Sequence, residues 1–160
     1  MTLPLKKNYK PMEADPAPEL PEGREWRYEP KWDGFRCLAF RDGDRIDLQS
    51  KSQKPLTRYF PELQSALREL RATKFVLDGE IAIPVDGQLS FDDLLQRIHP
   101  AESRVRKLAE STPCVYIVFD LLVGEKGQNL AASTLEERRE RLEAFAKKTC
   151  AEAASSNSLQ

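Results

Sequence analysis

Residues 35–50 constrain the fold most, because their pattern predicts a strand, a tight turn and a returning strand. FRCLAFR at 35–41 is an apolar run typical of a strand, and RIDLQS at 45–50 alternates polar and apolar residues. The Asp-Gly-Asp between them favours a tight turn, since Asp-Gly tolerates positive backbone φ angles. A hairpin joins antiparallel strands, so this stretch predicts an antiparallel sheet.

Three further stretches predict strands. WRYEPKW at 26–32 alternates, but Pro30 restricts it to a sheet edge or a strand end, because proline cannot donate a ladder hydrogen bond. FVLDGEIAIP at 75–84 is followed by a second turn signal, Val-Asp-Gly-Gln. CVYIVFDLLV at 114–123 is nearly all apolar, which predicts a strand buried on both faces.

Helices are expected between and after these strands. Their signals are a proline start, a serine cap and a Thr-x-x-Glu capping box, and the segments are 61–71, 91–98, 101–110 and 134–147. Strands joined by hairpins and interrupted by helices predict an α+β fold, with antiparallel sheets flanked by helices. We divide the chain into an extended lead-in at 1–25, a folded domain at 26–148 and a disordered tail at 149–160.

The composition is that of a globular domain in water. The chain has 160 residues, of which 40% are hydrophobic and 32% charged, enough for one domain with a core. It has no run of about 18 apolar residues and no secretory signal, so we expect a cytoplasmic protein without membrane association. A formal net charge of -1 does not indicate a strongly basic nucleic-acid binder, although a local basic patch can exist on a neutral molecule. Three widely spaced cysteines and one histidine indicate neither a disulfide framework nor a zinc site.

Lys31 lies in the stretch EPKWDGFR, directly before an Asp-Gly bend. One interpretation is a solvated lysine at a strand edge. The other is a nucleophile, which requires a lowered pKa because a free lysine amine is protonated near pH 7. A metal ion or Arg36 would supply the cation that lowers this pKa, and Trp32 and Phe35 would supply apolar walls.

Two other stretches contain candidate binding residues. Asp78 and Glu80 lie on one face of a strand at period two, and two carboxylates beside a lysine and phosphates suit a hard cation such as Mg²⁺. Solvated strand carboxylates are the alternative. Phe119 either packs in the core or stacks on a base. Asp120, inside an apolar run, needs a buried partner or a pocket to face.

Lys51 and Arg58 lie in SKSQKPLTRYF, which follows the predicted hairpin. They are either surface charges or phosphate contacts, the latter because both cations form strong hydrogen bonds with phosphate oxygens. This stretch alone does not distinguish surface charges from phosphate contacts. The order of all the candidate stretches along the chain provides further information.

Four stretches in this order resemble one family. Residues 31–36 fit the KxDGxR motif and resemble motif I of ATP-dependent DNA ligases, which RNA ligases and mRNA capping enzymes share. FVLDGEI resembles their motif III and VFDLL their motif IIIa, and SKSQKPLTRYFPEL is similar to the segment after motif I. PMEA and SFDDLLQR are similar to bacterial ligases of repair and end joining. The resemblance covers about residues 9–148 and implies the N-terminal part of an adenylation domain with the ATP-grasp-like nucleotidyltransferase fold.

The resemblance also implies a mechanism. In such ligases the motif I lysine attacks the α-phosphate of ATP and retains AMP as a lysyl-AMP. The AMP then passes to the 5′-phosphate at a nick in duplex DNA, and the 3′-OH displaces it. By this resemblance Lys31 is the nucleophile, Phe119 stacks on adenine, and the backbone near Glu29 and Pro30 contacts the adenine edge.

The charged residues are assigned by the same resemblance. Arg36 contacts the ribose or the nick end, and Glu80 binds the ribose or Mg²⁺, with Asp78 as a weaker metal ligand. These assignments fit phosphoryl transfer, which depends mainly on positioning and charge neutralisation. Lys51-Ser52 stands where the family commonly has Arg-Asn. A lysine retains the charge but lacks the bidentate guanidinium fork, so a weak phosphate contact is expected there and at Arg58.

Later parts of the family pattern are not found. The sequence contains no EGxxxK-like motif IV, no Lys-x-Lys motif V and no segment for a C-terminal OB-fold domain. We therefore expect an incomplete adenylation domain that does not seal nicks alone. It would pair with a complementing C-terminal half, or self-associate through exposed sheet edges and apolar surface. Two other functions stay open: an RNA ligase or capping-type nucleotidyltransferase, against which PMEA and SFDDLLQR argue, and a non-catalytic remnant that binds nucleotide, DNA or a partner.

Overall fold

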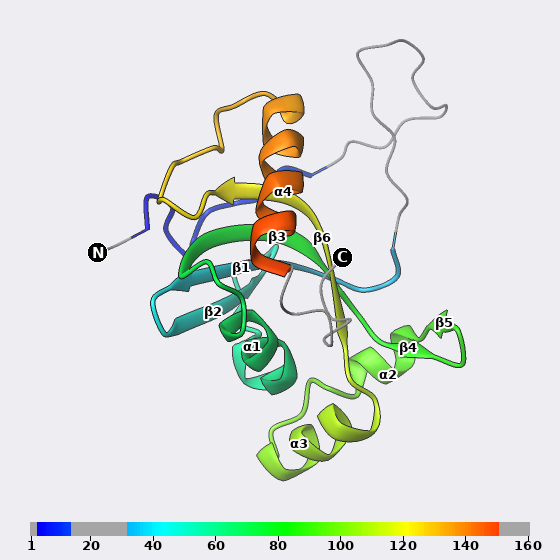
Figure 1. Ribbon diagram of the computed structural model, residues 1–160. Coiled ribbons are helices and arrows are strands. Elements are labelled where there is room, and N and C mark those ends of the chain that lie inside the picture. The colour runs from blue at the N-terminus through cyan, green and yellow to red at the C-terminus, as the bar shows by residue number, and fades with distance from the viewer. Residues whose placement is uncertain (1–2, 14–31, 151–160) are drawn as a thin grey trace.

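The computed structural model describes residues 3–13 and 32–150 (Figure 1). In this part of the chain one antiparallel sheet has the strand order β2-β1-β3-β6. Its strands are β1 (Phe35–Asp42), β2 (Arg45–Ser50), β3 (Lys74–Ala82) and β6 (Val115–Val123). A small second sheet pairs β4 (Pro84–Val85) with β5 (Gln88–Leu89).

The predicted hairpin is confirmed. β1 and β2 pair antiparallel, with Phe40 opposite Asp47 and Asp42 opposite Arg45, and Gly43 in the turn has a φ of 66°. The strand expected at 75–84 is divided, because β3 ends at Ala82 and β4 begins two residues later. The strand expected at 26–32 lies outside the described residues apart from Trp32.

The helices of the described chain begin close to their expected positions. They are η1 (Thr57–Tyr59), α1 (Pro61–Arg68), α2 (Phe91–Leu95), α3 (Glu102–Ser111) and α4 (Leu135–Cys150). α1 ends three residues before its expected end, where the buried Arg41 of β1 donates from Nη1 to three carbonyl oxygens, those of Leu67, Leu70 and Ala72. The α+β fold class with an antiparallel sheet is therefore confirmed.

α4 extends further than expected at its C-terminal end. Thr149 and Cys150 were placed in the disordered tail, but both belong to the helix. Thr149 is buried and donates its hydroxyl hydrogen to the Phe145 carbonyl at 2.8 Å, which stabilises the last turn. The remainder of the proposed tail and most of the proposed lead-in lie outside the described residues.

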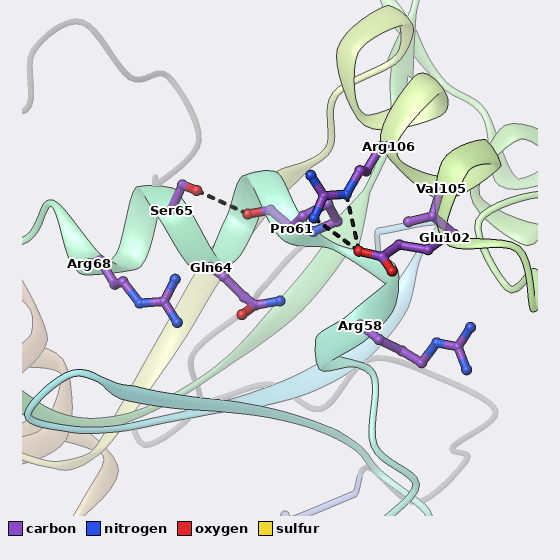
Figure 2. A pocket seen from close by; sticks show the side chains of 8 residues that line it. All are labelled: Arg58, Pro61, Gln64, Ser65, Arg68, Glu102, Val105 and Arg106. Atoms are coloured by element: carbon purple, nitrogen blue, oxygen red, sulfur yellow. Dashed lines mark hydrogen bonds and ion pairs between the residues drawn. The ribbon is translucent and has the colours of Figure 1, made fainter.

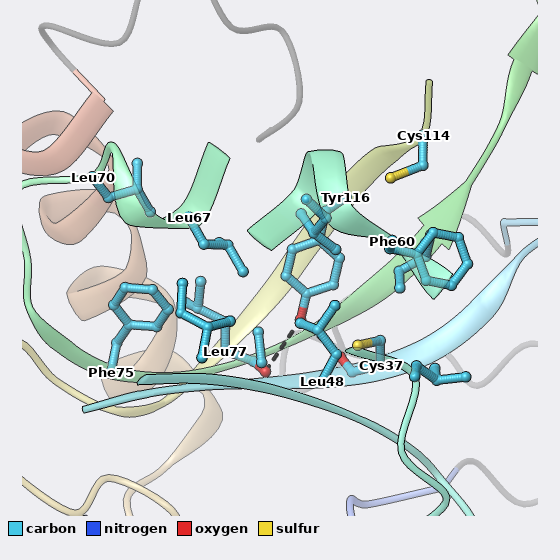
Figure 3. Close-up of a cluster of buried hydrophobic side chains, with 14 of the residues drawn as sticks. Cys37, Leu48, Phe60, Leu67, Leu70, Phe75, Leu77, Cys114 and Tyr116 are labelled. Carbon is cyan, nitrogen blue, oxygen red and sulfur yellow. Dashed lines mark hydrogen bonds between the residues drawn. The ribbon is translucent and has the colours of Figure 1, made fainter. Parts of the chain in front are cut away.

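The two faces of the main sheet pack against different parts of the chain. The helix face is covered by α1 and α4, whose Leu67 and Phe145 join a core built around Leu77 and Phe75 of β3 (Figure 3). The N-terminal face carries a smaller cluster made of Leu38, Phe40, Val76, Leu122 and Val123, over which Leu3, Leu5 and Tyr9 pack. Since side chains of a strand alternate between faces, β1 and β3 contribute to both layers.

The expectation that 114–123 is buried on both faces is wrong. Residues 117–120 of β6 are only partly buried. β6 is an edge strand of the described sheet, so β3 is its one neighbouring strand there and its other long edge is not covered by a strand. Two register shifts in its pairing with β3 also leave Phe119 and Leu122 without a Cα partner. Among the described residues, no helix has the length and apolar character that crossing a bilayer requires.

Candidate functional site

Arg36 and Asp78 form an ion pair on the N-terminal face of the sheet. Arg36 of β1 donates from Nε to Oδ1 of Asp78 at 3.0 Å and from an Nη to Oδ2 at 2.6 Å. The Asp78 side chain is 4% exposed and that of Arg36 is 21% exposed. Strand alternation explains the arrangement, because Arg36 lies directly opposite Glu80 in the register and Asp78 is two residues before Glu80 on the same face.

Burial and pairing act against each other in the pKa values of this pair. Burial raises the pKa of Asp78, and the hydrogen bonds and charge of Arg36 reduce that rise without cancelling it. Burial by itself lowers the pKa of Arg36, but Asp78, Glu80 and Glu13 outweigh it and leave the pKa above its ordinary value. Arg36 is therefore a permanent cation, held in one orientation at the edge of the buried layer.

Phe119 lies under the Arg36 guanidinium. The carbon at the centre of that group is 5.3 Å from the ring centroid, a cation–π contact. The sequence placed Phe119 in a regular strand. The register shift next to Asp78 and Gly79 leaves this residue outside the ladder, and such irregularities redirect side chains. Arg36 and Phe119, both singled out from the sequence, thus meet in the folded protein.

Asp120 has the buried partner that its apolar surroundings require. Both of its oxygens accept hydrogen bonds from Nε of Arg138, at 2.9 and 3.1 Å, and Arg138 also donates to the Ser133 carbonyl. Burial raises the pKa of Asp120, and Arg138 opposes that rise. Asp120 lies opposite Asp78 in the register, so the acids of the two acid–arginine pairs are neighbours on β3 and β6.

Arg138 was not among the residues that the sequence singled out. It lies on α4 four residues before Leu142 and seven before Phe145, which places all three on one side of the helix. Leu142 and Phe145 both pack against the core. An arginine on the apolar stripe of a helix was therefore the signal that could have identified the partner of Asp120.

Two glycines allow the backbone to pack closely around this site. A Cβ at Gly34 would lie 2.2 Å from the Ile81 carbonyl oxygen and 2.9 Å from Cγ of Glu80. At Gly79 it would lie 2.5 Å from the carbonyl oxygen of Ile117. Because backbone atoms cannot move aside as a flexible side chain can, both positions require glycine. The Asp-Gly bend is therefore seated directly against Glu80 and Ile81.

Other sequence candidates are placed elsewhere or not described. Lys31, Glu29 and Pro30 lie outside the described residues, and Trp32 is the first described residue after them. Lys51 is exposed in the turn after β2. Arg58 belongs to the α1 side of the molecule, where it donates to the Pro100 carbonyl at 2.7 Å and lines a cleft with residues of α1 and α3.

The metal assignment depends on Asp78 and Glu80. Both oxygens of Asp78 are hydrogen-bonded to Arg36, so this carboxylate is committed to an ion pair. The described residues contain no group of three or more His, Cys, Asp or Glu side chains placed to hold a metal ion. A Mg²⁺ ion commonly uses one or two carboxylates together with substrate phosphates, and the partly buried Glu80 is compatible with that mode.

The titration of Asp78 offers a direct check of the ion pair. We expect Asp78 to titrate above its ordinary value of 3.8 and its pKa to rise further in Arg36→Ala, which removes the opposing cation. Because the folded-state pKa is the higher one, the contribution of this carboxyl to the free energy of unfolding falls as the pH rises from 3.8 to the folded value. Carbon NMR of the side-chain carboxyl measures the pKa. Arg58→Ala, on the α1 side, serves as the control and should leave it unchanged.

Comparison with protein families and curated proteins gives consistent matches. A family model described as "ATP dependent DNA ligase domain" matches residues 11–159. DNA ligase C of Mycobacterium tuberculosis is 52% identical over 122 residues, which cover 76% of this chain and 34% of that protein. DNA ligase C1 of Mycolicibacterium smegmatis is 48% identical over 148 residues, covering 89% of this chain and 42% of that protein. The chain thus spans well under half the length of these relatives.

Solved structures resemble the described fold. A mycobacterial DNA ligase D, solved in complex with ATP and MES, superposes with a TM-score of 0.59 and 29% sequence identity. The match covers 76% of this chain and 36% of that one. The ligase domain of Mycobacterium tuberculosis LigD gives the same TM-score and identity. These likenesses agree with the α+β fold described above.

Proposed function

Because this chain belongs to the ATP-dependent DNA ligase domain family, we propose that it carries the nucleotide-binding part of an adenylation domain. Lys31 is the residue that accepts AMP from ATP. The observation that carries the proposal is the fixed Arg36 guanidinium, which Asp78 holds over Phe119. Arg36 is the last residue of the KxDGxR motif and lies at the N-terminal end of β1. A cation and an aromatic ring so placed are suited to the phosphates and the base of a nucleotide.

The proposed reaction needs a deprotonated amine. The Lys31 amine loses a proton and its lone pair attacks the α-phosphorus of ATP. A nitrogen–phosphorus bond forms as the bond to the bridging oxygen breaks, and pyrophosphate leaves. Arg36 would lower the cost of the negative charge on the phosphates, because its own charge is permanent and oriented. Glu29 and Pro30 would contact the adenine edge, and Phe119 would provide a ring for the base.

Mg²⁺ would supply further charge neutralisation on the phosphates. Glu80 is the residue proposed to hold it, since a single carboxylate with phosphate oxygens is a common Mg²⁺ environment. Asp78 stays a weaker candidate because its oxygens are bound to Arg36. Glu80 also lies within contact distance of the position that a Cβ at Gly34 would occupy, which supports its place beside the lysine motif.

The DNA substrate is part of the same proposal. The relatives are named DNA ligases, which supports AMP transfer to a 5′-phosphate at a nick in duplex DNA. A role in repair or recombination and a cytoplasmic location are proposed together with it. A non-catalytic remnant that binds a partner is the second candidate. The exposed apolar side chains of Phe91, Leu95 and Ile98 favour it, because exposed apolar surface suits contact with another protein. A complementing half or a second copy would be such a partner.

Covalent labelling tests the proposal. Incubating the chain with α-labelled ATP and Mg²⁺ should transfer label to the protein, and the label should survive denaturation because it is bound through a covalent bond. Removing Mg²⁺ with a chelator should reduce the label strongly. If the wild-type chain takes no label at any divalent metal concentration, the remnant function replaces the catalytic one.

Nick sealing separates adenylation from the complete reaction. We expect the 160-residue chain not to join a nicked duplex, because the two lysine motifs that contact the α-phosphate in the family are not found in its sequence. A denaturing gel of an end-labelled nicked duplex measures the joining, with a full-length ligase as the positive control. Efficient joining by this chain alone would contradict the expectation.

A further inference from the structure

A cleft between α1 and α3 collects arginine side chains on the opposite side of the sheet from the Arg36 site. It has a volume of about 570 Å³, and its lining residues include Arg58, Arg68, Glu102 and Arg106 (Figure 2). α1 packs on the helix face through Leu63 and Leu67, whereas Arg36 lies on the N-terminal face. The cleft is therefore separate from the nucleotide site proposed above.

The charge of the cleft is positive although the whole chain has a formal net charge of -1. Its single lining acid, Glu102, accepts hydrogen bonds from Arg106, at 2.9 and 3.2 Å, and both side chains are more than 70% exposed. Such an exposed pair is weak and exchanges readily. Arg58 and Arg68 are exposed, and they donate to neutral carbonyl oxygens, those of Pro100 and Asp44. Within the described part of the chain, neither guanidinium donates a hydrogen bond to a carboxylate.

The walls of the cleft are held by a buried residue. Arg97 is fully buried and donates to the Tyr59 carbonyl at 2.8 Å, to both oxygens of Glu62 and to the Thr112 carbonyl at 3.2 Å. Glu62 belongs to α1, and Thr112 directly follows α3. Arg58 also stacks on Tyr59 with 5.0 Å between guanidinium carbon and ring centroid, which limits its motion. The cleft is thus pre-organised by the fold.

We propose that this cleft binds the phosphate backbone of duplex DNA through Arg58, Arg68 and Arg106. α1 has eight residues and is about 12 Å long, while one strand of a duplex carries a phosphate about every 3.4 Å of axis. Arg58 of η1 precedes α1 and Arg68 is its last residue, so these two arginines are separated by about the length of three or four phosphates, which suits a polyanion better than one small anion. Arginine-lined walls also differ from the mainly apolar lining of small-molecule pockets.

The choice of DNA as the polyanion rests on the proposed function. The position and the positive charge of the cleft are observed independently of that function. Backbone contacts position a protein on a duplex without reading its sequence. The cleft would therefore contribute equally to nicked and intact duplexes, and it would act at a distance from the strand end at which Lys31 is proposed to react.

Salt-dependent binding tests the inference on the whole chain. Fluorescence anisotropy with labelled intact and nicked duplexes, from 50 to 200 mM salt, gives the slope of log K against log salt concentration. This slope is negative, and its magnitude decreases by about 0.9 for each lost phosphate contact. Arg58→Ala/Arg68→Ala should make that slope shallower by about two units on both duplexes. Arg58→Lys/Arg68→Lys keeps the charge and should keep most of the slope. Arg141→Ala/Lys147→Ala removes two exposed cations from α4 and should leave it unchanged.

The inference is overturned if the wild-type chain binds neither duplex at low salt, or if Arg58→Ala/Arg68→Ala has the wild-type slope. An acidic protein partner in the cleft would give that second result. An equal change in the α4 variant would also overturn it, because the charge effect would then not be local. Labelling of the wild-type chain by ATP is measured separately. If ATP labels the chain but Arg58→Ala/Arg68→Ala has the wild-type salt slope, the proposed function stands and the DNA-binding role of the cleft fails. If ATP does not label the chain but the slope changes in that variant, the DNA-binding role stands and the proposed adenylation fails.

Discussion

Lys31→Ala is expected to abolish covalent labelling of the chain by α-labelled ATP. The proposed nucleophile is the side-chain amine, and alanine has no group that can form the bond to the α-phosphorus. No neighbouring lysine can replace it without the same position relative to the phosphates, since effective attack requires near-contact geometry. The expected loss is therefore to background rather than partial, measured as label retained on the denatured protein.

Two controls make this result specific. Lys126→Ala removes an exposed lysine from the turn after β6, on no element of the proposed site, and should label like the wild-type chain. A thermal melt of Lys31→Ala should overlay that of the wild type, which shows that the loss is chemical. Retained label in Lys31→Ala would place the AMP on another residue and remove the basis of the lysine assignment.

Arg97→Met is expected to cost about 3–5 kcal/mol of unfolding free energy, the range for breaking a buried ion pair by removing one partner. The Arg97 side chain is 0% exposed and that of Glu62 is 19% exposed. Methionine keeps much of the volume, but among the described residues it leaves the Glu62 carboxylate with the Cys114 amide as its hydrogen-bond donor. The carbonyls of Tyr59 and Thr112 lose their Arg97 donors as well. Urea unfolding, followed by circular dichroism, measures the change.

The matched control is Arg45→Met at an exposed position. Arg45 also pairs with an aspartate, Asp47 at 2.9 Å, but its side chain is 68% exposed. Because water screens such a pair, this change should cost less than about 1 kcal/mol. In Arg97→Met/Glu62→Gln the total should be smaller than the sum of the single effects, since the second change removes the stranded charge. Equal costs for Arg97→Met and Arg45→Met would show that the buried Arg97–Glu62 pair does not stabilise the fold more than an exposed pair does.

Much of the secondary structure followed from local sequence. The hairpin at 35–50 and the starts of α1, α2 and α4 depend on turn residues, caps and periodicity within a few positions, so the sequence predicted them closely. Ser90 accepts a hydrogen bond from the Asp93 amide and Thr134 accepts one from the Glu137 amide, as their capping positions predict. Chain order also sufficed to recognise the ligase motifs, because those are read residue by residue.

The sequence by itself therefore determined the α+β fold class, the hairpin and the family. Only the tertiary structure decided which charges meet. Arg36 pairs with Asp78 across 42 residues, Asp120 with Arg138 across 18 and Arg97 with Glu62 across 35. The edge position of β6 and its register shifts, which bring Phe119 under Arg36, depend on which strands become neighbours. Turns and caps form from local hydrogen bonds, whereas strand order and buried ion pairs form only when distant segments pack, so no local pattern contains them.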